Sequence, residues 1–179
     1  MELRRAEILT LIEAATERLL DTVADLTGER LREDSLLPGW SRGHVLTHVA
    51  RQADAMRNLL AWARTGIPTP AYASREARDA DIEAGAGRDA TALIADLRES
   101  AAAFAEAVAV MPDDAWDVEV EIWGNRIPVT QVLARRIAEL ELHHVDLGLD
   151  YRPADWSAEF DTMDLPVPLD ELRDERRSW

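Results

Sequence analysis

The segment TQVLARRIAELELHHVDLG, residues 130–148, joins a helical apolar pattern to a cluster of ionisable side chains. Its apolar residues recur with the period of an α-helix, at Val132, Leu133, Ile137, Leu140 and Leu147. Positions four apart lie on the same face of a helix, so Glu139 pairs with His143, and Asp146 follows on that side. The segment therefore predicts a helix with one apolar face and one face of groups that bind metals.

Three other stretches have the same helical period, and together they predict the fold. The four long helices are expected at residues 3–26, 41–65, 89–111 and from 130 onward. Ser41 is a predicted N-cap, and a short helix is expected after Ser74 in the long connection. Residues 118–129 alternate around Gly124-Asn125, which indicates a hairpin. The fold class predicted is all-α, an antiparallel four-helix bundle with a small β-hairpin between the third and fourth helices.

The length of 179 residues suits one domain with a hydrophobic core. Residues 1–150 are predicted to form a metal-binding helix bundle. Residues 151–179 are expected to be a short C-terminal extension without a complete second domain, with one or two helical turns marked by Trp156, Phe160 and Met163.

The net charge of −15 argues against several classes of partner. Nucleic-acid phosphates and anionic membrane surfaces both repel such a chain, so neither is an expected partner. No apolar run approaches the roughly 18 residues of a membrane span, and residues 1–20 resemble an amphipathic helix rather than a signal peptide. A cytoplasmic location is therefore expected, and the oligomeric state is left open.

Two residue types are absent from the chain, and their absence narrows the catalytic reactions that its side chains can perform. The chain has no cysteine, and all 20 of its basic residues are arginine. Without cysteine there are no disulfides, thiolate metal sites or cysteine nucleophiles. Without lysine there is neither Schiff-base catalysis nor a P-loop lysine.

A third metal ligand is expected from the helix at 41–65, which carries His44 and His48. His48 is preferred because it lies deeper in the helix among apolar residues, whereas His44 is in the first turn and is either solvated or part of the cap. His48, Glu139 and His143 would leave an open coordination position, as catalytic zinc sites do. Fe(II) and Ni(II) accept the same ligands, and Asp146 could orient an imidazole through its second nitrogen.

The same residues also have a purely structural interpretation. A Glu and a His four apart on a helix are commonly a surface pair, and a single His among apolar residues is commonly a hydrogen-bonded core residue. The pattern alone leaves both interpretations open.

Longer stretches of the sequence resemble a known family. They are LLPGWSRGHVLTHVA (36–50), NLLAWARTG (58–66), TPAYASREARDADI (69–82) and RIAELELHHVDLG (136–148). Over about residues 3–150 the chain resembles the N-terminal domain of the mycothiol-dependent maleylpyruvate isomerases, in the DinB-like group of four-helix metal proteins. The resemblance implies a divalent metal, usually zinc, held by His48, Glu139 and His143. Glu141 and His144 fall outside the motif.

The resemblance also implies an activity. These isomerases use the thiol cofactor mycothiol, whose thiolate adds to the alkene of maleylpyruvate, allows rotation and is eliminated to leave fumarylpyruvate. A chain without cysteine fits this chemistry, because the sulfur arrives from outside. Arg78 matches a family arginine, and Tyr72 and Arg78 are expected to contact the thiol or the electrophilic substrate. No catalytic residue is expected beyond the metal site.

One difference bears on the substrate. The isomerases carry a second, C-terminal α+β domain with a substrate-binding arginine, and residues 149–179 are too few for it. Two alternatives to the isomerase therefore remain: a mycothiol S-transferase that acts on another electrophile, and a non-catalytic metal-binding bundle.

Overall fold

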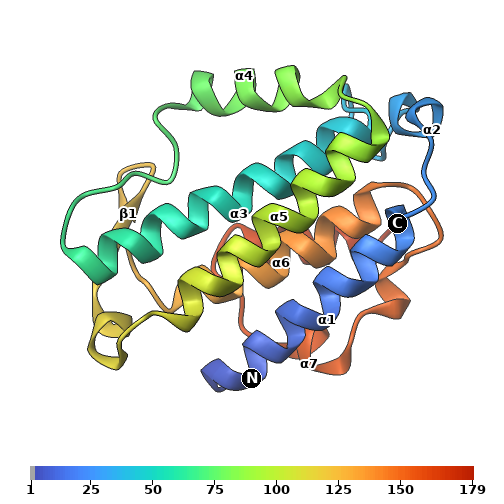
Figure 1. The fold of residues 1–179 in the computed structure, drawn as a ribbon. Coiled ribbons are helices and arrows are strands. Elements are labelled where there is room, and N and C mark those ends of the chain that lie inside the picture. Colours follow the sequence, from blue (N-terminus) through green and yellow to red (C-terminus); the bar gives the residue numbers. More distant parts are fainter. Residues whose placement is uncertain (1–2) are drawn as a thin grey trace.

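A computed structural model describes residues 3–179 (Figure 1). The long helices are α1 (Arg5–Val23), α3 (Arg42–Thr65), α5 (Ala90–Ala109) and α6 (Gln131–Asp146). The shorter helices are α2 (Gly28–Arg32), α4 (Arg75–Ala86), α7 (Ala158–Thr162) and α8 (Leu169–Arg177). The strands are β1 (Glu119–Ile122) and β2 (Asn125–Pro128), and 3-10 turns cover Asp113–Asp117 and Pro153–Asp155. Among residues 3–179, no helix is long and apolar enough to cross a membrane.

The four long helices form the bundle that the sequence predicts. Helix α3 packs along α5 and α6, and α1 packs along α6, so their apolar faces enclose one core. Helix α4 runs outside the bundle beside α3 (Figure 1). The predicted fold class, all-α with one hairpin between the third and fourth bundle helices, is confirmed.

Helix α3 begins and ends at the residues that its sequence indicates. The Ser41 side chain accepts a hydrogen bond from the backbone N–H of His44, and Gly66 ends the helix with a φ of 72°. A φ in this left-handed region favours glycine, because it has no Cβ to clash with the backbone. These ends fix which residues of α3 face α6.

The hairpin turn lies one residue earlier than expected. Trp123 and Gly124 have φ values of 53° and 83°, and Asn125 already belongs to β2. Positive φ at both central residues fits a two-residue turn whose twist matches the strands. A left-handed tryptophan is costly, so its neighbours must hold it there.

The chain after α6 returns across the bundle instead of leaving it. Trp156, Phe160, Met163 and Leu169 are buried in the same hydrophobic core as the long helices. Helix α8 packs on α6, and the sequence did not predict this helix because seven of its nine residues are charged. The C-terminal segment thereby reaches the polar face of α6.

Gly43 of α3 and Gly85 of α4 let these two helices approach closely, and Gly43 provides a test of the contact. A Cβ at Gly43 would lie 2.3 Å from the backbone oxygen of Ala86. We expect Gly43→Ala to lower the free energy of unfolding by about 1–3 kcal/mol, the usual cost of overpacking. Gly87→Ala is the matched control, since nothing lies within 4 Å of its Cβ. Thermal unfolding measures both, and equal melting temperatures would contradict the close approach.

Candidate metal site

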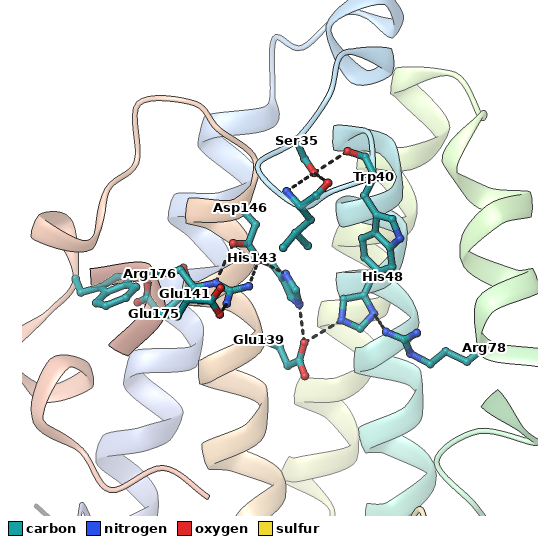
Figure 2. Close-up of polar contacts among 12 residues, drawn as sticks. Ser35, Trp40, His48, Arg78, Glu139, Glu141, His143, Asp146, Glu175 and Arg176 are labelled. Atoms are coloured by element: carbon teal, nitrogen blue, oxygen red, sulfur yellow. Dashed lines mark hydrogen bonds and ion pairs between the residues drawn. The ribbon is translucent and has the colours of Figure 1, made fainter. Parts of the chain in front are cut away.

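Three of the predicted residues meet between α3 and α6 (Figure 2). His48 Nε2 on α3 and His143 Nε2 on α6 each lie 3.0 Å from Glu139 Oε2. One donor atom from each of the three residues lies within 4.8 Å of the others. Ligands at zinc distances of about 2.0–2.2 Å lie within roughly twice that of one another, so the cluster fits one divalent cation.

The helices explain why these side chains converge. Glu139 and His143 are four residues apart and share the inward face of α6. His48 lies in the middle of a buried stretch of α3 that packs on α6. His44, one turn earlier, contacts Ser41 and Glu83 instead, so it belongs to the helix cap and not to the cluster.

The protonation states of the three cluster residues depend on their contacts with one another. Burial raises the pKa of Glu139, but hydrogen bonds with His143 and His48 outweigh it and hold that pKa well below its usual value. Burial alone would lower the pKa of His143, whereas its hydrogen bonds to Asp146 and Glu139 raise it to about 9. Burial lowers the pKa of His48. The metal-free cluster thus holds an ionised carboxylate beside a protonated His143, and a cation would displace that proton.

Asp146 orients His143 from behind. Its carboxylate is fully buried and its Oδ2 lies 2.7 Å from His143 Nδ1. Arg176 of α8 donates to both oxygens of Asp146, at 3.0 Å from Nε and 3.1 Å from Nη2. With Nδ1 committed to Asp146, Nε2 of His143 faces Glu139, as metal-binding histidines with an outer carboxylate do.

These contacts form one continuous polar chain in Figure 2. It runs through Arg176, Asp146, His143, Glu139, His48 and Arg78. The sequence predicted every member except Arg176, whose helix it did not predict.

Glu141 and His144 lie on the opposite face of α6, away from the cluster. His144 Nε2 lies 2.8 Å from Thr22 Oγ1, and its ring stacks on Tyr151 with centroids 3.8 Å apart. Glu141 accepts hydrogen bonds from Arg18 and Tyr151. Burial lowers the pKa of His144 to about 4, so it is a neutral core residue. Both residues stabilise the packing of α6 on α1 and the C-terminal segment.

A cavity of about 480 Å³ opens beside the cluster. Its aromatic wall contains Trp40, Tyr72 and Trp123. Tyr72 and Trp123 stack with centroids 5.5 Å apart and planes at 5°, which explains what holds Trp123 in its left-handed conformation. Burial raises the pKa of Tyr72 to about 12, so its hydroxyl is a neutral hydrogen-bond donor.

Arginines outnumber carboxylates in the lining of this cavity: Arg75, Arg78, Arg135 and Arg176 line it, against Asp79 and Glu139. Arg78 pairs with Asp79 and Arg176 with Asp146, which leaves Arg75 and Arg135 without an ion-paired carboxylate among the lining residues that the structure describes. The predicted contact residues Tyr72 and Arg78 both line it, and Arg78 Nη2 lies 3.3 Å from His48 Nδ1. The buried Nε of Arg135 has no acceptor among residues 3–179. Such a lining complements an anionic ligand, because guanidinium groups pair with carboxylates.

Sequence reasoning missed several lining residues. Arg135 precedes Glu139 by four positions, so the same helical spacing that paired Glu139 with His143 could have found it. The contributions of Trp123, Leu169 and Leu172 had no comparable signal, because the hairpin and α8 reach the cavity only through tertiary packing.

Comparisons with known proteins agree with this architecture. A family model described as the mycothiol maleylpyruvate isomerase N-terminal domain matches residues 12–148. Crystal structures of the mycothiol-dependent maleylpyruvate isomerase and of its histidine-to-alanine mutant each superpose with a TM-score of 0.85 at 34% identity, covering 89% of this chain and 67% of the other. No curated protein matches the chain. The chain therefore belongs to the mycothiol maleylpyruvate isomerase N-terminal domain family.

Proposed function

We propose that the chain is a metal-dependent enzyme that uses mycothiol to isomerise maleylpyruvate. The observation that carries the proposal is the cluster of His48, Glu139 and His143 at the wall of an arginine-lined cavity. Its support is the 34% identity to a mycothiol-dependent maleylpyruvate isomerase over 89% of this chain.

His48, Glu139 and His143 would hold the divalent cation, with zinc as the proposed metal. Two imidazoles and one carboxylate leave a coordination position open. A bound zinc ion would supply Lewis acidity, which favours the thiolate form of a coordinated thiol. The absence of cysteine is consistent with a thiol that comes from a cofactor.

Metal binding would change the contacts of Arg78. Arginine only donates hydrogen bonds, so its contact with His48 Nδ1 requires a lone pair on that nitrogen. A neutral His48 that offers Nε2 to a cation carries its proton on Nδ1, which removes that lone pair. Arg78 would then leave His48 and turn its guanidinium toward the cavity, where a substrate carboxylate would accept from it.

The other residues of the cavity would bind the substrate and stabilise charge. When a thiolate adds to the alkene, the electron pair moves to the conjugated carbonyl oxygen and the C–C bond becomes single. Arg75 and Arg135 line the cavity and would stabilise that developing charge, while the Tyr72 hydroxyl would donate to it. Rotation and loss of the thiolate then restore the alkene as the trans isomer, with no net redox change.

The decisive test uses the Co(II)-loaded protein with mycothiol. We expect an intense sulfur-to-metal absorption band with mycothiol and a weaker one with simpler thiols, since the rest of mycothiol would contact the cavity. Turnover of maleylpyruvate is expected only when both metal and mycothiol are present. Arg78→Met should retain Co(II) but lose turnover. Arg126 forms an exposed ion pair with Glu119 and supplies the control, so Arg126→Met should retain both Co(II) and turnover.

The outcomes separate the alternatives. A thiolate band without maleylpyruvate turnover, but with conjugation of other electrophiles, would identify a mycothiol S-transferase. A fully Co(II)-loaded protein whose spectrum no thiol perturbs would leave a non-catalytic metal-binding bundle and overturn the proposal.

A further inference from the structure

A second cavity lies on another side of the bundle, between α1 and α5. Its volume is about 500 Å³, and it shares no lining residue with the arginine-lined cavity. Leu9, Ile12 and Leu20 line it from α1, and Ala102, Ala105 and Val108 line it from α5. The alanines leave the space that larger side chains would fill. Along α1 the groove spans about 16 Å, from the helical rise of roughly 1.5 Å per residue.

Arg136 of α6 lies among the residues that line this groove, which we call the α1–α5 groove. Its side chain is fully buried, and its guanidinium lies 5.8 Å from the ring centroid of Phe104. Nη1 donates to Val49 O and to Gln52 Oε1, both at 2.9 Å. Nε and Nη2 are buried and have no acceptor among residues 3–179.

A buried guanidinium with two free donor groups is energetically costly. Buried charges in proteins are normally paired, and unpaired buried donors lose their hydration without compensation. Glu139 and Asp54 lie near enough to favour the charged form, yet neither accepts a hydrogen bond from Nε or Nη2. The chemistry that satisfies both donors is a carboxylate, which accepts two parallel N–H bonds from one guanidinium.

We propose that the α1–α5 groove binds an amphipathic monocarboxylate, with its carboxylate on Arg136 and its apolar chain along α1 and α5. The volume lies within the usual range of small-molecule sites, roughly 300–1,000 Å³. Exposed Glu13, Glu17 and Arg98 line the groove, and because the two carboxylates outnumber the one guanidinium, the charge of the rim disfavours a second carboxylate. The site therefore selects monoanions over dianions. It goes beyond the proposed isomerase activity and requires neither metal nor thiol.

Calorimetric titration with decanoate, decanol and decanedioate tests the ligand chemistry, below the concentration at which decanoate forms micelles. We expect one decanoate per chain, with at least about tenfold weaker binding of decanol, because a hydrogen bond to a charged group contributes roughly 1.5–3 kcal/mol. Decanedioate should also bind more weakly than decanoate. Equal binding of decanoate and decanol would overturn the role of Arg136, and no binding at all would overturn the site.

Two variants test the location. Ala105→Leu fills the groove from an exposed position and should abolish decanoate binding, while Ala80→Leu, an exposed alanine of α4, should not change it. Arg136→Gln should weaken decanoate at least about tenfold and leave decanol unchanged. If Arg136→Gln fails to fold, Ala105→Leu still decides the site. Undiminished binding to Ala105→Leu, or self-association of the chain that this variant abolishes, would overturn the proposal.

Discussion

Replacing His143 with alanine is expected to remove zinc from the protein, whereas replacing its neighbour His144 is expected to leave zinc bound. His143 Nε2 faces Glu139, while His144 points to Thr22 on α1. Loss of a direct ligand should lower zinc affinity by more than about 100-fold. This exceeds the roughly 10–100-fold loss that is typical when a residue hydrogen-bonded to a ligand is replaced. Zinc content after dialysis, measured by elemental analysis, gives the comparison. His48→Ala should behave like His143→Ala.

His144→Ala should lower the free energy of unfolding although it leaves zinc bound. His144→Ala removes a hydrogen bond to Thr22 and a stacked contact with Tyr151, so we expect a loss of about 1–3 kcal/mol in the metal-free protein. Zinc should stabilise this variant and the wild type, by about 2.7 kcal/mol at a concentration 100 times the dissociation constant. Zinc should not stabilise His143→Ala. Equal loss of zinc in both variants would mean that the ligand is not His143.

Removal of Arg176 is expected to be the most destabilising single change near the site. Arg176 and Asp146 are 4% and 0% exposed, and the pair is held by two hydrogen bonds. Arg176→Met leaves the Asp146 carboxylate buried with His143 alone, and breaking such a pair typically costs about 3–5 kcal/mol. Because Asp146 also orients His143, zinc affinity should fall by about 10–100-fold. Denaturant unfolding and zinc titration measure the two effects.

Arg177 supplies the matched control from the next position of α8. It pairs with Asp161 at the surface, where both side chains are more than a third exposed. Exposed ion pairs contribute little, so Arg177→Met should change stability by less than about 1 kcal/mol and leave zinc affinity unchanged. Similar losses in the two variants would indicate that α8 only covers the core and does not act through Asp146.

The sequence by itself determined the four long helices and the side chains that converge between α3 and α6. Apolar residues at the helical period specify which face of each long helix is buried, and that same period places Glu139, His143 and Asp146 on one side. Ser41 and Gly66 specify the ends of α3, and thus the position of His48 along it. This information is local, so it can be read within a few turns of helix.

Tertiary structure alone decided what surrounds that cluster. Arg176 is 30 residues beyond Asp146, and its charged helix has no apolar pattern that would direct it to a buried carboxylate. Tyr72 and Trp123 stack although they come from different connecting segments. Nothing in the sequence around Arg136 distinguishes it from an exposed helical arginine, yet the bundle buries it fully. A contact between residues far apart in the sequence leaves no trace in local periodicity, because it depends on how the chain folds back on itself. The convergence of His48, Glu139 and His143 was therefore predictable, whereas the cavity walls, the support of His143 and the α1–α5 groove were not.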